Sequence, residues 1–238
     1  MALRRGPIVD LCRPLLGSLA LAISGGVADA DPPGSTLADW LAETLPGGWS
    51  APDHLILHDP ADLSSWRFGA YAGMLNDDYL HNLEFSPWHS AHMFLPYYLV
   101  AADATYSVMD FPYVPAGLDL DLVAAEHFGG QEFAEFVVVP GVRWKWFPWN
   151  DYIYTNLRVG PVGVSYDTSI SRVEAAETKG GWTSQFLSAL EEEVTFAPSA
   201  SSKWEVFVRI HHRSGIYGRI DGVNGGTNYV TAGWRTGF

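Results

Sequence analysis

Cysteine is almost absent from this chain: Cys12 is the one cysteine in 238 residues. It lies in an N-terminal segment that we interpret below as a cleaved leader, so the mature chain has no thiol. This excludes a disulfide, a cysteine nucleophile and a thiolate-bound metal. No lipobox stands before a cleavage point at Cys12, which argues against a lipoprotein.

Long apolar runs and basic residues are also scarce. No stretch after residue 30 approaches the roughly 20 apolar residues of a transmembrane helix, so a membrane-spanning form would have to be a β-barrel. Without residues 1–30, which hold three arginines and two aspartates, 11 Lys and Arg face 25 Asp and Glu, a net charge of about −14. Such a surface disfavours nucleic acid as a partner.

The first 30 residues have the pattern of a Sec-type signal peptide. Arg4, Arg5 and Arg13 precede an apolar run at 15–27, which ends in an Ala-Asp-Ala sequence at 28–30. We predict cleavage after Ala30 and a mature chain in the bacterial envelope. The alternative, a membrane-anchoring first helix, conflicts with a run of 13 residues, which is too short to span.

The mature chain divides into two parts. Residues 31–62 are rich in Pro and Gly, with one short helical candidate at 36–45, and we predict a periplasmic extension or a plug at a barrel mouth. Residues 63–238 contain eight strand-like segments, the smallest number that outer-membrane barrels use. They are 66–75, 97–108, 118–128, 132–147, 152–167, 186–196, 203–214 and 228–238.

Side chains in these segments alternate with a period of two, as a strand between two environments requires. In the third segment, Leu118, Leu120 and Leu122 fall on one face, and Asp119 and Asp121 on the other. The sixth segment contains the run Glu-Glu-Glu at 191–193, which interrupts the alternation and leaves its register open.

We therefore predict an all-β fold, an eight-stranded antiparallel transmembrane β-barrel with a short N-terminal periplasmic extension. Residues 76–91, 171–184 and 215–227 become surface loops, tryptophans gather near the periplasmic ends, and the chain closes on Phe238. A soluble secreted β-domain is the alternative. In the barrel, charges on the inward faces should pair and fill a narrow lumen: Arg67, Arg143, Lys145, Arg158, Arg209 and Arg235 with Asp119, Asp121 and Glu205.

The seventh segment ends with side chains that can do chemistry. His212 and Ser214 share a face with Val206, Val208 and Ile210, so they point outward, toward lipid. Their Cα atoms are about 7 Å apart on a strand, a distance that two side chains can close. This permits a serine nucleophile with a histidine base.

Asn228, on the last strand, should lie at the same height near the outer rim. Polar groups that face hydrocarbon cost free energy unless they lie at the interface or work there. These side chains are therefore either a functional site or rim residues at the level of the lipid headgroups.

Residues 203–238 resemble the PagL-type lipid A 3-O-deacylases. The resemblance is carried by a strand ending in His-x-Ser, a Gly- and Asn-rich loop, an Asn-x-Gly sequence and a last strand that closes on an aromatic residue. It implies an eight-stranded outer-membrane barrel whose catalytic groups face the outer leaflet. It also implies Ser214 as nucleophile, His212 as base and Asn224, with the backbone at Gly215, as the oxyanion site.

Two positions depart from the family pattern. Gly215 stands where the family usually has asparagine, and Asn228 stands where the family orients its histidine with glutamate. An amide can hold an imidazole N–H but does not stabilise the imidazolium as a carboxylate does. The loop candidates for the missing acid are Asp221, Glu174 and Glu177, and Asn228→Glu is expected to raise activity.

The sequence thus favours an outer-membrane serine esterase that acts on lipid A and needs no cofactor or metal. The alternative is a non-catalytic barrel with an envelope-structure or lipid-binding role. Oligomeric state and other partners are not predicted. His89 and His92 have the spacing of a helical metal pair but lack further ligands, and the Asn-Asp-Asp run at 76–78 has the composition of a turn.

Overall fold

A computed structural model of the chain describes residues 54–87, 91 and 93–237. The predicted signal peptide at 1–30, the helix at 36–45 and residues 31–53 of the extension lie outside the described residues. So do His89, His92 and the terminal Phe238. Of the predicted extension, residues 54–62 are described, and they include the two-residue strand β1 (Ile56–Leu57), which pairs with β3 at Met109 and Asp110.

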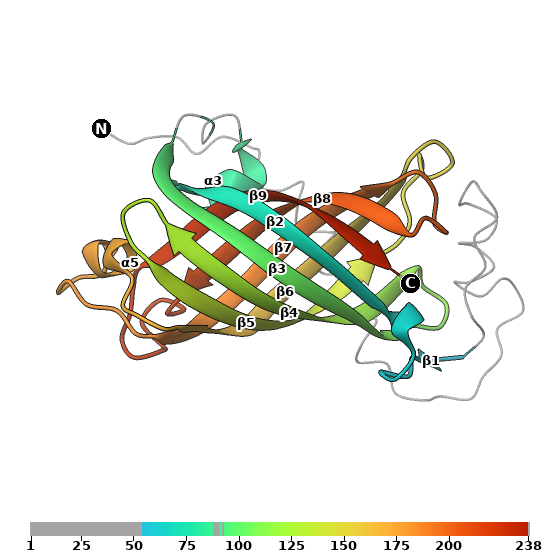
Figure 1. Cartoon of the computed structure of the whole chain (residues 1–238), viewed down its shortest axis with the longest axis horizontal. Helices are drawn as coiled ribbons and strands as arrows, with labels where there is room; N and C mark the ends of the chain where they lie inside the picture. The colour runs from blue at the N-terminus through green and yellow to red at the C-terminus, as the bar shows by residue number, and fades with distance from the viewer. Residues whose placement is uncertain (1–53, 88–90, 92, 238) are drawn as a thin grey trace, which may run out of the picture. The chain divides into compact units, whose positions relative to one another are not determined.

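Eight antiparallel strands close into a barrel, which confirms the predicted fold class (Figure 1). Each strand pairs with the next in sequence, and β2 pairs with β9 to complete the circle. The strands are β2 (Trp66–Asn76), β3 (Phe94–Asp110), β4 (Ala116–Phe128), β5 (Phe133–Trp144), β6 (Tyr154–Asp167), β7 (Phe186–Ala197), β8 (Trp204–Ser214) and β9 (Gly226–Gly237). The short 3-10 helix η1 (Leu63–Ser65) leads into β2.

The two ends of the barrel differ. We call one the turn end, where residues 111–115, 145–153 and 198–203 connect the strands. The other is the loop end, where the connections are 77–93, 129–132, 168–185 and 215–225. They include helices α3 (Leu80–Phe85) and α5 (Arg172–Glu177). The described residues of the segments predicted as surface loops lie at the loop end.

One turn shortens the strands relative to the prediction. Asn150 donates from Nδ2 to the Lys145 carbonyl at 3.0 Å, and its Oδ1 accepts from the Thr155 N–H at 3.1 Å. This asparagine thereby holds residues 145–153 out of the sheet, so β5 ends at Trp144 and β6 begins at Tyr154. Lys145 pairs with Asp110 beside this turn and takes no part in the ion pairs deeper in the lumen.

Arginine and carboxylate side chains fill the lumen as predicted. Arg209 lies 2.6 Å from both Asp121 and Glu193, and Arg235 lies 2.6 Å from Asp103 and 3.0 Å from Glu205. All of these side chains are almost completely buried. Buried charges are tolerated when each one is paired and hydrogen-bonded. Each of these side chains has an ion-pair partner, while Asp103 Oδ1 and Asp121 Oδ2 accept no hydrogen bond from the described residues.

The network also fixes the register of β7, which the sequence left open. Glu191 and Glu193 face the lumen, where Arg158 reaches Glu191 at 2.8 Å and Arg209 reaches both carboxylates. Glu192, between them, faces outward and is half-buried. The alternation is therefore regular through the acidic run, because two of its three carboxylates have arginine partners inside.

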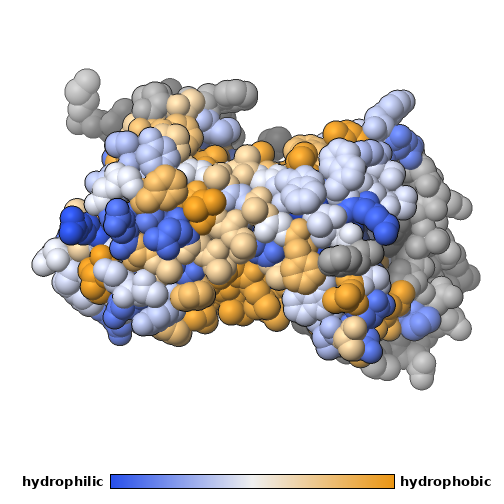
Figure 2. All heavy atoms as spheres, viewed as in Figure 1, coloured by the Kyte–Doolittle hydropathy of each residue, from blue (hydrophilic) through white to orange (hydrophobic). Residues whose placement is uncertain are grey.

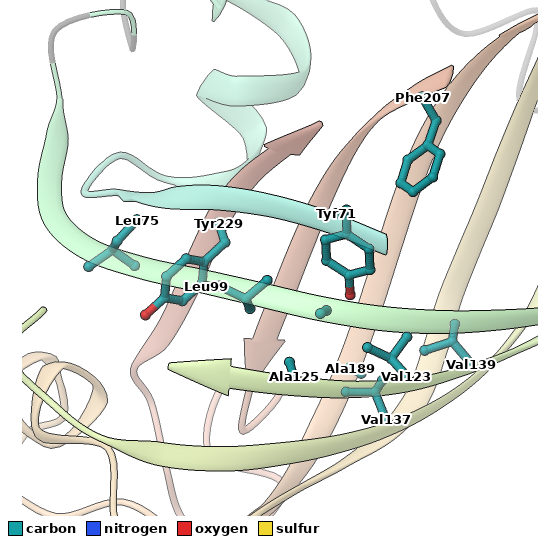
Figure 3. Packing of buried hydrophobic residues seen from close by; sticks show 11 residues of the cluster. Tyr71, Leu75, Leu99, Val123, Ala125, Val137, Val139, Ala189, Phe207 and Tyr229 are labelled. Carbon is teal, nitrogen blue, oxygen red and sulfur yellow. The ribbon is translucent and has the colours of Figure 1, made fainter. Parts of the chain in front are cut away.

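A smaller apolar cluster shares the lumen with these ion pairs (Figure 3). Tyr71 and Phe207 meet edge to face, with ring centroids 5.9 Å apart. The guanidinium of Arg235 lies 4.3 Å from the Phe207 ring, so the cluster and the ion network are in direct contact. The lumen is thus packed with side chains.

The outer wall has the opposite character. Outward-facing side chains such as Phe136, Val208 and Trp234 remain 52%, 49% and 50% exposed. Figure 2 shows apolar side chains gathered over the middle of the barrel, with more polar residues toward both ends. An apolar patch of this kind indicates a surface that meets something other than water. Among the described residues, no helix is long and apolar enough to cross a membrane.

Cysteine substitution in the chain without its predicted signal peptide, which contains no cysteine, tests the facing of β8. Nitroxide labels at positions 206 and 208 should be accessible to oxygen in a lipid bilayer, because Val206 and Val208 face outward. Labels at 205 and 207 should be protected, because Glu205 and Phe207 are buried. The reverse pattern would mean a register shift of one residue, which moves every side chain to the other face.

Removing one arginine of the ion network should lower the free energy of unfolding of the barrel. Arg235→Met leaves Asp103, Glu193 and Glu205 short of a partner, and loss of one member of a buried ion pair costs about 3–5 kcal/mol. Urea unfolding in detergent micelles measures the change. The matched control is Arg219→Met, at an exposed loop residue, which should change stability by less than about 0.5 kcal/mol.

Candidate active site

Pairing between β8 and β9 brings the predicted site residues together at the loop end. Ser214, the last residue of β8, lies opposite Gly226, the first of β9, and His212 lies opposite Asn228. Arg209, His211 and Arg213 face the lumen and are buried, so His212 and Ser214 face outward. The facing of these two side chains is therefore a consequence of strand geometry.

The three side chains form a chain of hydrogen bonds. His212 Nε2 lies 3.0 Å from Ser214 Oγ, and His212 Nδ1 lies 2.6 Å from Asn228 Oδ1. A hydroxyl, an imidazole and an orienting acceptor in this order are the elements of an activated serine. The arrangement is able to remove a proton from Ser214.

Asn228 is 8% exposed although it faces outward. Its Nδ2 donates to the backbone carbonyl of Asp78 at 2.7 Å, in the connection between β2 and β3. The turn at 76–78 is held by its own side chains: Asn76 Oδ1 accepts from the Asp78 N–H at 3.1 Å, and Asp78 Oδ1 accepts from Asn82 Nδ2 at 2.6 Å. The Asn-Asp-Asp run thus has the turn role that its composition indicates.

Two glycines leave room for this arrangement. A Cβ at Gly226 would lie 2.9 Å from Ser214 Cβ and 3.4 Å from His212 Cε1. A Cβ at Gly215 would overlap the carbonyl oxygen of Val223, whose side chain is fully buried. Position 215 therefore has no room for a side chain, because the loop residue Val223 packs directly against Gly215. This gives a steric reason for glycine where the resemblance leads us to expect asparagine.

The backbone after Gly215 takes an unusual course. Ile216, Tyr217 and Gly218 have φ values of 50°, 54° and 84°, in the left-handed region. For Ile216, which is β-branched, this conformation is strained. Hydrogen bonds from the Gly218 N–H to the Val223 carbonyl and from the Ile220 N–H to the Gly215 carbonyl hold the strained turn beside Ser214.

Asn224, expected at the oxyanion site, is exposed in the same loop. Its Nδ2 donates to the Gly222 carbonyl at 3.1 Å. Within the described part of the chain, none of its hydrogen bonds reaches Ser214 or His212. A role at the oxyanion would require its amide to leave Gly222.

The three loop acids proposed as substitutes for a glutamate have other partners. Asp221 accepts from Ser184 Oγ at 2.6 Å, and Glu174 is buried with Arg213 as its ion-pair partner. Glu177 accepts from the Gly226 N–H at 3.3 Å, and burial raises the pKa of both Glu174 and Glu177. Among the described residues, Asn228 is the side chain hydrogen-bonded to His212 Nδ1.

Comparison with known proteins finds similarity to solved structures and to no family model or curated protein. No family model matches the chain, and no curated protein matches it. The outer-membrane enzyme PagL has a TM-score of 0.47 at 10% identity, covering 72% of this chain and 99% of its own. Neisserial surface protein A has 0.40 at 10% identity, covering 73% and 97%, and the Yersinia pestis outer-membrane protein Ail has 0.34 at 13%, covering 71% and 98%. These values carry no argument about the activity of this chain.

Within residues 54–87, 91 and 93–237, no group of three His, Cys, Asp or Glu side chains is placed to hold a metal ion. Sequence reasoning missed two groups at the site, the Asp78 carbonyl and Gly226. The first is a backbone atom 150 positions from its partner Asn228, so the sequence contains no signal for it. The second, Gly226, is the glycine of the Asn-x-Gly sequence, and that motif is the one sequence signal for it.

The reactivity of Ser214 can be tested without knowing the substrate. A fluorophosphonate probe should label the purified, folded protein at Ser214, because His212 can take the hydroxyl proton. Labelling should be lost in Ser214→Ala and fall at least about 100-fold in His212→Ala, the lower range for general-base catalysis. Ser201→Ala, at an exposed turn residue, is the control. Equal labelling of all four proteins would contradict an activated Ser214.

Proposed function

We propose that this protein is an outer-membrane serine esterase that removes an ester-linked acyl chain from lipid A. The observation that carries the proposal is the hydrogen-bonded chain of Ser214, His212 and Asn228 on the outward face of the barrel wall. A nucleophile at this position faces the lipid phase at the rim, where the acyl esters of a glycolipid lie below its sugar headgroup.

In the proposed reaction, Ser214 Oγ attacks the ester carbonyl while His212 Nε2 takes its proton. The carbonyl oxygen becomes an oxyanion, stabilised by backbone N–H groups at Gly215 and by Asn224 once its amide turns from Gly222. Collapse of this intermediate breaks the ester C–O bond, and His212 returns the proton to the departing sugar oxygen. Water then hydrolyses the acyl-serine, which releases a fatty acid and restores Ser214.

The membrane assignment is supported by the inverted polarity of the barrel. Its lumen holds ion pairs such as Arg209–Asp121, whereas its outer wall exposes apolar side chains such as Val208. This is the pattern of an outer-membrane barrel. The filled lumen disfavours a channel. Together with the predicted signal peptide, this pattern supports an orientation with the turn end in the periplasm and the loop end at the cell surface.

The second candidate is a non-catalytic barrel with a structural or lipid-binding role. Asn228 favours it, because an amide leaves the imidazolium of His212 without a neighbouring negative charge, and loss of that charge cost about 10⁴ in rate in a serine protease. The fold is common to both functions and does not separate them.

Mass spectrometry of lipid A separates the two candidates. Expression in a bacterium with fully acylated lipid A should produce a species lighter by one hydroxyacyl chain. Ser214→Ala and His212→Ala should each abolish this species and leave a folded barrel that migrates anomalously on a gel until boiled, since both residues lie on the outer surface. Ser201→Ala should retain the activity. Unchanged lipid A with folded wild-type protein in the outer membrane would favour the non-catalytic barrel.

A further inference from the structure

The side-chain amide of Asn228 has a fixed orientation. A backbone carbonyl only accepts hydrogen bonds, so the Asn228 atom that lies 2.7 Å from the Asp78 carbonyl oxygen must be the NH₂ group. The amide oxygen then faces His212. This assignment follows from the chemistry of the Asp78 carbonyl.

The orientation of Asn228 in turn determines the proton on His212. Asn228 Oδ1 lies 2.6 Å from His212 Nδ1, and an amide oxygen only accepts, so Nδ1 must be the nitrogen that carries hydrogen in the neutral ring. His212 Nε2 is then left with a free lone pair, 3.0 Å from Ser214 Oγ. A general base for Ser214 needs this tautomer.

We propose that the β2–β3 connection is part of the catalytic machinery: the Asp78 carbonyl is a positioning group that sets the tautomer of His212 through Asn228. The proposal deepens the esterase function above and rests on it for its effect on turnover. It gives this chain a way to orient its histidine without a carboxylate.

The connection is built to hold that carbonyl in place. Asn76, the last residue of β2, lies directly opposite Asn228 in the sheet, so the turn begins beside its target. Asp78 Oδ1 accepts from the Tyr79 N–H at 2.8 Å and from Asn82 Nδ2 at 2.6 Å, which fixes the peptide against the start of α3. Leu83 of α3 is buried, so the helix is packed against its surroundings. Figure 1 shows α3 beside β2 and β9 at this end of the barrel.

This arrangement reverses the expectation for position 228. A carboxylate there would set an oxygen against the Asp78 carbonyl oxygen, with no hydrogen between them. The glutamate of the expected substitution is also one methylene longer than asparagine. Asn228→Glu should therefore lower activity, because the Asp78 carbonyl in the β2–β3 connection needs the N–H donor of an amide at position 228.

The first test reads the tautomer directly. Nitrogen-15 NMR of the full-length mature protein in detergent micelles, with His212 assigned by comparison with His212→Ala, should show a protonated Nδ1 and an unprotonated Nε2 in the neutral ring. A neutral ring protonated on Nε2 would overturn the proposal. This readout needs no substrate, so it stands whether or not lipid A proves to be the substrate.

The second test uses Asn228→Asp, which keeps the shape of the side chain and removes its donor. The rate of Ser214 labelling by a fluorophosphonate, and lipid A deacylation where the wild type shows it, should fall about tenfold or more, as expected when a buried acceptor loses its donor. Ser86→Asp adds the same charge at an exposed residue after α3 and should leave both rates unchanged. A higher rate in Asn228→Asp would show that a carboxylate is preferred and would overturn the proposal.

A third variant leaves every side chain of the triad intact. Asn82→Ala removes a hydrogen bond that holds Asp78 and should loosen the turn. The labelling rate should fall several-fold, and the His212 signals should move toward a mixture of the two tautomers. An unchanged tautomer and rate, together with a β2–β3 connection that has become open to proteolysis, would show that the Asp78 carbonyl does not position Asn228. If the wild type shows the Nδ1–H tautomer but no activity on lipid A, the esterase function is contradicted and the positioning of His212 by Asp78 and Asn228 is not.

Discussion

The pairing of arginine and carboxylate side chains inside the barrel is the interaction on which the other features depend. Arg209 and Arg235 are fully buried, and each contacts carboxylates from more than one strand. A strand alternates its side chains with a period of two, so a charge fixed in the lumen fixes its neighbours on the outside. On β8, inward Arg209, His211 and Arg213 leave Ile210, His212 and Ser214 outward.

This dependence connects stability to the site. The ion pairs are several residues away from Ser214, yet they determine that its hydroxyl meets the outer surface and not the lumen. Arg213 extends the connection to the loop end, because it pairs with Glu174 of α5. The side chains of the proposed triad lie on two adjacent, hydrogen-bonded strands, which gives them a rigid support, and the surrounding loops complete the site.

Much of the fold was predictable because alternation is a local signal. All eight strands are predicted from the sequence. The proximity of His212 to both Ser214 and Asn228 follows once the strand order is assumed. The acidic run at 191–193 resisted prediction, since which glutamate turns inward depends on arginines of other strands. The short helix α3 was missed because its sequence has no side-chain cap at its N-terminus and is only six residues long.

The contact between Asn228 and Asp78 marks the limit of sequence reasoning at the site. From the sequence, Asn228 is interpreted as a replacement for the glutamate that orients the histidine in the family that residues 203–238 resemble. In the structure it is a donor and an acceptor at once, joining His212 to a backbone carbonyl of another loop. A backbone acceptor leaves no trace in residue identity, so the sequence alone does not predict that Asn228 contacts both partners.

Oxygen labelling of the products, compared between the wild type and Ser214→Ala, tests cleavage of the acyl ester by Ser214 most directly. Purified wild-type protein and lipid A would be incubated in water enriched in oxygen-18, and both products weighed by mass spectrometry. Hydrolysis of an acyl-serine predicts one heavy oxygen in the released fatty acid, none in the hydroxyl left on the sugar, and no release by Ser214→Ala. Release that persists in Ser214→Ala, or no release by the folded wild type, would contradict the account.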